Sequence, residues 1–169
     1  MKNKVQIDPK MDMTRDMDLV EGSKGISYWF TTLADIPEDF FAKYVKGKRF
    51  IDLGCGDGRI VWLARRCGAL KYRGIEIDES FIRKAAFHRY MKKGDFHDID
   101  FNNYDVLYYF LFSDVDKELE LVERLKNFDG VIIVYHRKVT HRLPEFHEAM
   151  VKQGFKSIED IKYLRVYKK

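Results

Sequence analysis

Two kinds of hydrophobic pattern alternate along the chain from about residue 36 onward. In the first kind, apolar side chains recur every three to four residues; the clearest run begins at Ile60, includes Leu63 and ends at Cys67, and it predicts an amphipathic helix. In the second kind, several consecutive residues are mostly apolar, which is typical of buried strands. The regular alternation of the two predicts an α/β domain with a mostly parallel sheet.

The elements expected from these patterns follow one another in a definite order. Strands are expected at Arg49–Leu53, Tyr72–Ile77, within Phe87–Lys92, and at Asp105–Phe110, Gly130–Tyr135, Phe155–Ile158 and Ile161–Tyr167. Helices are expected at Pro37–Val45, after Gly58, after the capping residue Asp78, after a capping box of Ser113 and Asp116, and at Pro144–Gln153. The link between the last two strands is so short that they should pair as an antiparallel hairpin.

Residues 1–24 lack this organisation, because acidic and basic side chains mix with methionines and no period is evident. We expect a flexible or peripheral N-terminal segment there, followed by a single domain over residues 25–169. Of the 169 residues, 46% are hydrophobic and 34% are charged, which is typical of a folded domain.

The charge balance says little about partners. A net charge of +4 is too small to indicate nucleic-acid binding by itself. Residues 151–169 carry six basic and two acidic side chains. We interpret them as protection of an exposed sheet edge, with contact to an acidic partner as the alternative.

Membrane, secreted and metal-binding proteins are disfavoured by the sequence. No stretch approaches the roughly 20 apolar residues of a membrane span, and the charged N-terminus does not resemble a signal peptide. The two cysteines, Cys55 and Cys67, have neither metal-site spacing nor the number that a disulfide framework needs. We therefore expect a cytoplasmic protein without a metal site or a membrane partner.

A glycine-rich loop, D-L-G-C-G-D-G at residues 52–58, lies between a predicted strand and a predicted helix. Its glycines allow a sharp turn and a close approach of the backbone to a ligand. The loop ends at a helix N-terminus, where free N–H groups can face that ligand. Glu76 follows Gly54 by 22 positions, at the end of the next strand, where a carboxylate can accept the protons of two ribose hydroxyls.

The spacing and charge of this loop distinguish between cofactors. The third glycine comes one residue earlier than in the G-x-G-x-x-G loop of nicotinamide-binding proteins. Asp52 and Asp57 would repel a pyrophosphate, but they suit a zwitterionic or cationic cofactor such as S-adenosylmethionine (SAM). Cys55 is interpreted as a small loop residue, since no base is predicted near its thiol. Arg59 is either a solvated residue or an ion-pair partner of a loop acid.

The runs D-L-G-C-G-D-G-R at residues 52–59 and G-I-E-I-D at residues 74–78 resemble the first two motifs of class I SAM-dependent methyltransferases. The resemblance extends over the element order from about residue 36 to 169. It implies a Rossmann-like, doubly wound, seven-stranded sheet with a C-terminal antiparallel hairpin, and SAM as the cofactor. The residues that it places at the cofactor are Asp52, Gly54, Cys55, Gly56, Asp57, Gly58, Glu76 and Ile77, with Asp95 and Phe96 beside the adenine.

The segment after the fourth predicted strand bears on the methyl acceptor. It lacks the Asn/Asp-Pro-Pro-aromatic motif of many enzymes that methylate adenine N6 or glutamine. Instead it is similar to an F-L-L segment of archaeal protein-lysine methyltransferases, which also carry a Y-x-x-T element; here Phe30 stands at the proline of that element. This resemblance implies a lysine acceptor that loses its proton in an apolar, aromatic site. It places Tyr28 and Thr31 at the cofactor, and Trp29, Phe110, Leu111 and Phe112 on the substrate side.

Several alternatives stay open at this point. The sequence assigns no catalytic residue; His136 is a candidate general base, but we interpret it as a surface histidine. Aromatic side chains that alternate along the fourth strand, including Tyr108, fit core packing as well as a binding site. The acceptor could be RNA, contacted by the basic C-terminal end. A non-catalytic SAM-fold subunit is a third reading, against which the intact loop and Glu76 argue.

Overall fold

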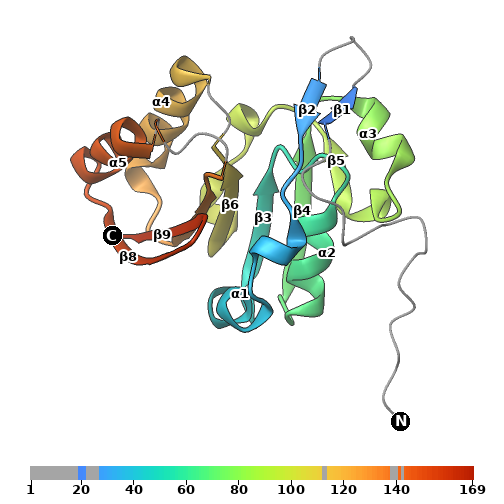
Figure 1. Cartoon of the computed structure of the whole chain (residues 1–169), viewed down its shortest axis with the longest axis horizontal. Coiled ribbons are helices and arrows are strands. Elements are labelled where there is room, and N and C mark those ends of the chain that lie inside the picture. The colour runs from blue at the N-terminus through green and yellow to red at the C-terminus, as the bar shows by residue number, and fades with distance from the viewer. Residues whose placement is uncertain (1–18, 22–26, 112–113, 138–140, 142) are drawn as a thin grey trace.

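A computed structural model describes residues 19–21, 27–111, 114–137, 141 and 143–169, with the backbone alone at residues 19–21 and 27–29. Its main feature is a seven-stranded sheet (Figure 1). The strands are β3 (Arg49–Leu53), β4 (Lys71–Glu76), β5 (Met91–Lys93), β6 (Val106–Phe110), β7 (Val131–Tyr135), β8 (Lys156–Ile161) and β9 (Leu164–Lys168). Their order is β5-β4-β3-β6-β7-β9-β8. The first five are parallel, and β9 pairs antiparallel with both β7 and β8. The predicted Rossmann-like sheet and its C-terminal hairpin are confirmed.

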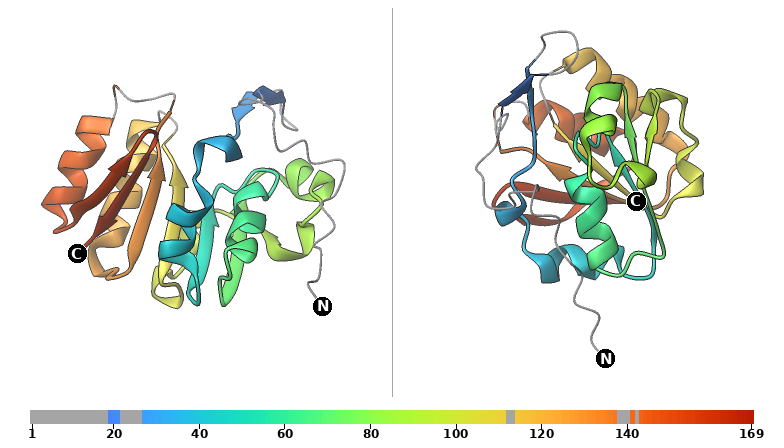
Figure 2. Two further views of the ribbon diagram at one scale, coloured as in Figure 1. Left: turned by 60° about the horizontal axis from the view of Figure 1, so that its bottom comes forward. Right: turned by 90° about the vertical axis from the view of Figure 1, so that its right-hand side faces the viewer.

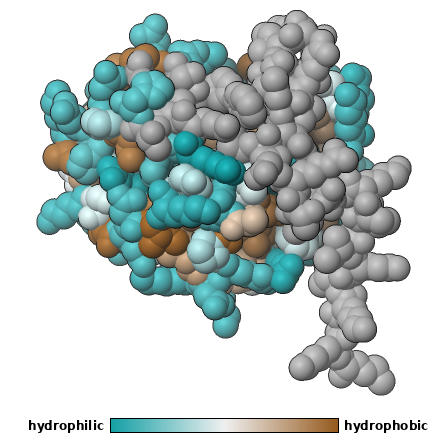
Figure 3. All heavy atoms as spheres, viewed as in Figure 1, coloured by the Kyte–Doolittle hydropathy of each residue, from teal (hydrophilic) through white to brown (hydrophobic). Residues whose placement is uncertain are grey.

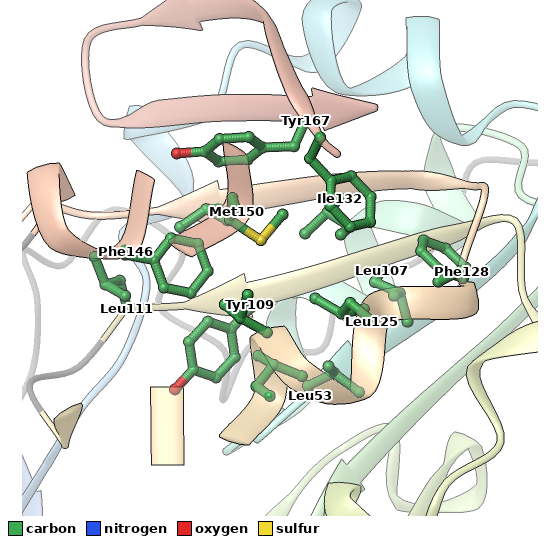
Figure 4. Packing of buried hydrophobic residues seen from close by; sticks show 14 of the residues in the cluster. Leu53, Leu107, Tyr109, Leu111, Leu125, Phe128, Ile132, Phe146, Met150 and Tyr167 are labelled. Atoms are coloured by element: carbon green, nitrogen blue, oxygen red, sulfur yellow. The ribbon is translucent and has the colours of Figure 1, made fainter. Parts of the chain in front are cut away.

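Helices cover both faces of this sheet (Figure 2). They are α1 (Glu38–Val45), α2 (Arg59–Arg66), α3 (Glu79–Lys84), α4 (Val115–Arg124) and α5 (Leu143–Lys152). The apolar sides of α4 and α5 pack on one face of the sheet, where Phe146 and Met150 meet Tyr167 of β9 (Figure 4). The apolar sides of α1 and α2 pack on the other face. Because β6 and β7 are buried on both faces, their sequences are apolar at almost every position.

The described part of the face seen in Figure 3 is mostly hydrophilic, with smaller hydrophobic areas between the hydrophilic side chains. In the described ranges, no helix is both long and apolar enough to cross a bilayer.

Strand order reverses at β3, which has β4 on one side and β6 on the other. In open α/β sheets, ligands bind in the crevice beyond the carboxyl ends of the strands at such a switch point. The glycine-rich loop leaves β3 at its carboxyl end and enters α2. The topology therefore places the loop where a ligand site is expected.

The edge of the sheet at β5 differs from its prediction. A strand was expected within Phe87–Lys92, but β5 contains Met91–Lys93 alone, after a 3-10 turn at His88–Tyr90. β5 pairs with β4 over three positions, and of its side chains Met91 alone is buried. So short an edge strand leaves little hydrophobic signal in the sequence.

Two element boundaries and one additional sheet also differ from the prediction. β8 continues to Ile161 instead of ending at Ile158, and Lys162, with φ of 45°, occupies the turn before β9. In the predicted capping box, Ser113 lies outside the described residues; the N-cap of α4 is Asp114, whose carboxylate accepts the N–H of Lys117. Finally, an unpredicted two-stranded antiparallel sheet joins β1 (Leu19–Glu21) to β2 (Ser27–Trp29).

Gly74 of β4 allows the glycine-rich loop to pack closely against the sheet. A Cβ at Gly74 would lie 2.4 Å from Sγ and 2.7 Å from Cβ of Cys55, and 2.9 Å from Cγ2 of Val61. We expect Gly74→Ala to lower the free energy of unfolding by about 1–3 kcal/mol, because the added methyl overpacks this contact. Urea denaturation measures the loss. Cys55→Gly removes two of the three contacts, so the two changes should be strongly non-additive; simple additivity would contradict this packing account.

Candidate functional site

The glycine-rich loop depends on three glycines in left-handed backbone conformations. Gly54, Gly56 and Gly58 have φ values of 76°, 55° and 80°, which other residues rarely adopt. The N–H groups of Gly54 and Cys55 both donate to the carbonyl of Ile75 at 2.9 Å, and so they attach the loop to β4. The sequence therefore forms a turn in which the backbone, with no Cβ at these positions, faces the crevice.

Two buried carboxylates lie beside this turn, at the ends of β3 and β4. Asp52 is 3% exposed and Glu76 is 6% exposed. The two oxygens of Glu76 accept the N–H groups of Gly56 and Asp78, each at 2.8 Å. Burial raises the pKa of Glu76, although these backbone hydrogen bonds oppose the shift.

Asp52 is the most strongly perturbed of the loop acids. Burial raises its pKa well above the usual value, and the charges of Glu76 and Asp57 raise the pKa further. Burial likewise raises the pKa of the Cys55 thiol, which agrees with a packing role for that side chain. The site thus concentrates negative potential where a cation would be stabilised.

Residues 30–31 lie directly over the glycine-rich loop. The Phe30 ring lies so close to Gly56 that a Cβ there would be 2.5 Å from its Cε1. The ring also meets the edge of Phe81, with the ring centres 5.2 Å apart. The Thr31 hydroxyl shares a 2.8 Å hydrogen bond with the hydroxyl of Tyr108 on β6. These contacts leave a cavity of about 30 Å³, which has room for no more than a water molecule or two.

Arg59 connects this covering segment to the loop. Its guanidinium forms an ion pair with Asp57 at 2.7 Å and donates to the Thr31 carbonyl at 3.1 Å. The sequence offered an ion pair with a loop acid as one reading of Arg59, and the structure confirms it. Contact of Phe30 and Tyr108 with the loop was not predicted, since residues so distant in sequence carry no local pattern that brings them together.

The structure gathers only part of the predicted site into this cavity. The predicted residues that line it are Thr31, Asp52, Gly54, Cys55, Asp57 and Phe110. Ile77 lies outside the cavity and is 61% exposed. Asp95 caps the 3-10 turn Phe96–Asp98, and Phe96 meets the edge of Tyr109 with ring centres 5.9 Å apart. The side chains of Tyr28 and Trp29, and the whole of Phe112, lie outside what the structure describes.

Aromatic and acidic side chains form a second pocket near the carboxyl end of β6. Its volume is about 220 Å³. The residues that line it lie near the starts of α4 and α5: Val115, Glu118, Leu119, Glu145 and Phe146. Tyr109 stacks on Phe146 with ring centres 6.4 Å apart. Burial raises the pKa of Tyr109, and the charges of Glu118 and Asp114 raise it further, so carboxylates lie close to its hydroxyl.

His136 is buried, so its prediction as a surface histidine is wrong. The side chain is 4% exposed, and burial lowers its pKa, which favours the neutral ring at pH 7. Its backbone N–H donates to the carbonyl of Tyr163, so the pairing of the sheet continues one residue past β7. Within the described residues, neither ring nitrogen has a hydrogen-bond partner.

Asp35 links the segment that covers the loop to the end of β7 and to the turn between β8 and β9. It lies at the end of a 3-10 turn, Leu33–Asp35, and is 6% exposed. Its carboxylate accepts the hydroxyl of Tyr135 at 2.8 Å, and it pairs with Arg137 and Lys162 at 2.9 Å each. Burial opposes ionisation of Asp35, but these partners outweigh it and lower the pKa.

We expect Asp35→Asn to lower the free energy of unfolding by about 1–2 kcal/mol at pH 7, because charged hydrogen bonds are lost at a partly exposed cluster. Because the folded-state pKa is lowered, the wild-type contribution is fully present above the unfolded pKa, near 4, and is lost as the pH falls through the folded value. Urea denaturation from pH 3 to pH 7 tests this. A variant that loses the same stability at both ends of this range would contradict the account.

No group of three or more His, Cys, Asp or Glu side chains that could hold a metal ion occurs within the described ranges.

Comparisons with known proteins agree with this geometry. A family model described as a methyltransferase domain matches residues 45–168. Among solved structures, the chain is similar to ribosomal protein L11 methylase from Lactobacillus delbrueckii subsp. bulgaricus, with 17% identity, a TM-score of 0.58, and 77% of this chain and 74% of that chain covered. It is also similar to an RNA methyltransferase from Salinibacter ruber in complex with S-adenosyl-L-homocysteine, with 21% identity, a TM-score of 0.53, and 78% of this chain and 91% of that chain covered. A third similar structure is a methyltransferase from Pyrococcus furiosus, with 18% identity, a TM-score of 0.60, and 89% of this chain and 86% of that chain covered. No curated protein sequence matches the chain.

At these identities, the likeness to solved structures shows the shared fold. The family match covers most of the chain and includes the whole glycine-rich loop and β4. The chain belongs to the methyltransferase-domain family and is a SAM-dependent methyltransferase of class I.

Proposed function

We propose that SAM binds at the carboxyl ends of β3 and β4, with its methionine part on the glycine-rich loop and its ribose at Glu76. Glu76 accepts backbone N–H groups from Gly56 and Asp78, with a further contribution from Ile77, and a carboxylate offers about four acceptor sites, so acceptor capacity remains for the ribose. The ammonium and the sulfonium of SAM would relieve the negative potential at Asp52. The exposed Ile77 side chain, with Asp95 and Phe96 farther along, offers a surface for the adenine.

A cavity of about 30 Å³ is too small for the methionine part of SAM, so we propose that the segment at Phe30 and Thr31 moves when the cofactor binds. Bound SAM supplies a methyl group on a sulfonium, which an acceptor nitrogen takes by in-line displacement. The contribution of this chain is then to bind, orient and exclude water from the reacting groups. We assign Tyr28 and Thr31 to the cofactor side of the resulting site, because β2 leads directly into the segment that covers the loop.

We propose that the methyl acceptor is a lysine side chain of a protein. The observation that carries this proposal is the pocket near the carboxyl end of β6, whose lining includes the Phe146 ring and the carboxylates of Glu118 and Glu145. The ring of Tyr109 stacks on that of Phe146. Carboxylates and aromatic faces both attract a cationic side chain. Once buried among apolar groups, a lysine releases its proton more readily and becomes a nucleophile.

The residues on the substrate side would come from two segments. Phe110 ends β6 and lines the cofactor cavity, and Leu111 follows it; we place Phe112 with them because it comes next in the chain. Trp29 ends β2 and would approach from the cofactor side. The negatively charged phosphodiester backbone of RNA would be repelled by the carboxylates at this pocket, so we prefer a protein acceptor over the RNA alternative.

Incubation of the purified protein with methyl-labelled SAM and cell extract tests the acceptor. We expect label in protein bands that survive ribonuclease, and lysine methylation at the labelled site by mass spectrometry. Glu76→Gln serves as the matched control and should transfer no label. Label that is lost on ribonuclease treatment would identify RNA as the acceptor and contradict the lysine proposal. SAM binding without any transfer would favour a non-catalytic subunit.

A further inference from the structure

Arg59 is the one cationic side chain among those that line the cofactor cavity in the described part of the chain. It opens α2, directly after the last glycine of the loop, and its side chain is 12% exposed. The guanidinium lies over the Phe30 ring, 5.2 Å from the ring centre. A buried cation in a pocket that must receive a positively charged cofactor calls for a physical reason, because like charges repel.

The hydrogen bonds of Arg59 leave part of its guanidinium available. Nε and Nη2 bind the carboxylate of Asp57 at 2.7–3.0 Å, and Nη1 donates to the Thr31 carbonyl at 3.1 Å. A guanidinium has five N–H protons, so these contacts use one on each nitrogen and leave one on each terminal nitrogen. Two such protons form the fork that binds a carboxylate in a bidentate manner.

The charges around the cavity match an amino acid better than a simple cation. Asp52 and Asp57 supply negative charge, and Arg59 supplies positive charge from the first turn of α2. SAM carries both an ammonium and a carboxylate on its methionine part. A pocket with acids alone would bind the ammonium but repel the carboxylate, whereas this mixture can satisfy both.

We infer that Arg59 binds the α-carboxylate of the methionine part of SAM, while Asp52 faces the ammonium; this rests on the SAM site proposed above. The ion pair with Asp57 orients the guanidinium, and the Phe30 ring supports its plane in the cofactor-free protein. Arg59 is thus a cofactor-binding residue that selects the complete amino-acid end of SAM.

Calorimetric titration with SAM and with decarboxylated SAM tests this inference, because the two ligands differ only in the carboxylate. We expect the wild-type protein to prefer SAM by about 10- to 100-fold, the size of one charge-assisted contact. Arg59→Gln should weaken SAM binding by a similar factor and leave decarboxylated SAM almost unaffected, so that the preference disappears. Arg66→Gln, in the same helix with an exposed ion pair to Glu38, is the matched control and should retain the preference.

Each other outcome has a distinct meaning. If Arg59→Gln weakens both ligands equally, Arg59 only maintains the loop and the inference is wrong. If it weakens neither, Arg59 does not contact the cofactor, and the inference is again wrong. If the wild-type protein binds neither ligand, the proposed SAM site itself fails, and this is seen before any variant is compared.

Discussion

Gly56→Ala is expected to weaken SAM binding by about 100-fold or more, an effect typical of a displaced or obstructed binding geometry. The new Cβ would point into the space that the Phe30 ring now fills, 2.5 Å from its Cε1, and in the proposed site the methionine part of SAM would occupy this same space. The change also forces an alanine into a backbone with φ of 55°, which strains the loop. Calorimetric titration with SAM measures the loss.

A second glycine separates these two effects. Gly47 has φ of 71° and no atom within 4 Å of a Cβ placed there, and it lies far from the loop in the turn before β3. Gly47→Ala should therefore lose stability through strain but keep its affinity for SAM. If both variants bind SAM as the wild type does, the glycine-rich loop is not the cofactor site.

Asp52→Asn is expected to stabilise the cofactor-free protein while it weakens SAM binding. Because burial raises the pKa of Asp52, loss of its proton costs more in the folded state than in the unfolded chain, where the group titrates near pH 4. The stability of the wild type therefore falls as the pH rises from about 4 toward the folded-state value. Asparagine removes this cost, which we expect to gain roughly 1–2 kcal/mol at pH 7, a typical size for one unfavourable buried group.

The affinity for SAM should depend on pH in the opposite direction to the stability of the cofactor-free protein. In the proposed site the ammonium of SAM lies near Asp52, so binding should favour the ionised carboxylate, and the affinity of the wild type should rise with pH. Asp52→Asn should lose much of this pH dependence together with its affinity. Thermal unfolding with and without SAM, from pH 5 to pH 8.5, checks both effects.

Asp105 provides a control of opposite sign for this prediction. It forms an ion pair with Arg49 at 2.7 Å, and this contact lowers its pKa. Asp105→Asn should therefore lose stability at neutral pH and leave SAM binding unchanged. A destabilised Asp52→Asn variant with normal affinity would show that Asp52 is a structural residue and would contradict its assignment to the cofactor.

The centre of the fold could be predicted because its physical causes are local. β6 and β7 are buried on both faces, so their sequences are continuous apolar runs, and the glycines of the loop adopt positive φ. β5 was misplaced for the opposite reason: it is held by three ladder pairs to β4 at a sheet edge, and most of its side chains are exposed.

The contacts that complete the site depend on tertiary structure. Phe30 covers a loop that begins more than 20 residues later, and the three partners of Asp35 lie up to 127 residues from it in the sequence. His136 is buried where the pairing of the sheet continues one residue past β7, which its neighbours in sequence do not reveal. The position of Arg59 directly after the loop indicated an ion pair with a loop acid as one of two interpretations. That its partner is Asp57 and that its side chain is mostly buried became clear only from the structure.

The most direct test of the central claim is an amide chemical-shift titration of the ¹⁵N-labelled protein with S-adenosylhomocysteine, which binds as SAM does but transfers no methyl group. The account predicts the largest changes at Gly54, Gly56, Gly58, Glu76 and Ile77, with further changes at Phe30 and Thr31 as the covering segment moves. Changes centred elsewhere, or none at millimolar ligand, would contradict the assignment of the cofactor to the carboxyl ends of β3 and β4.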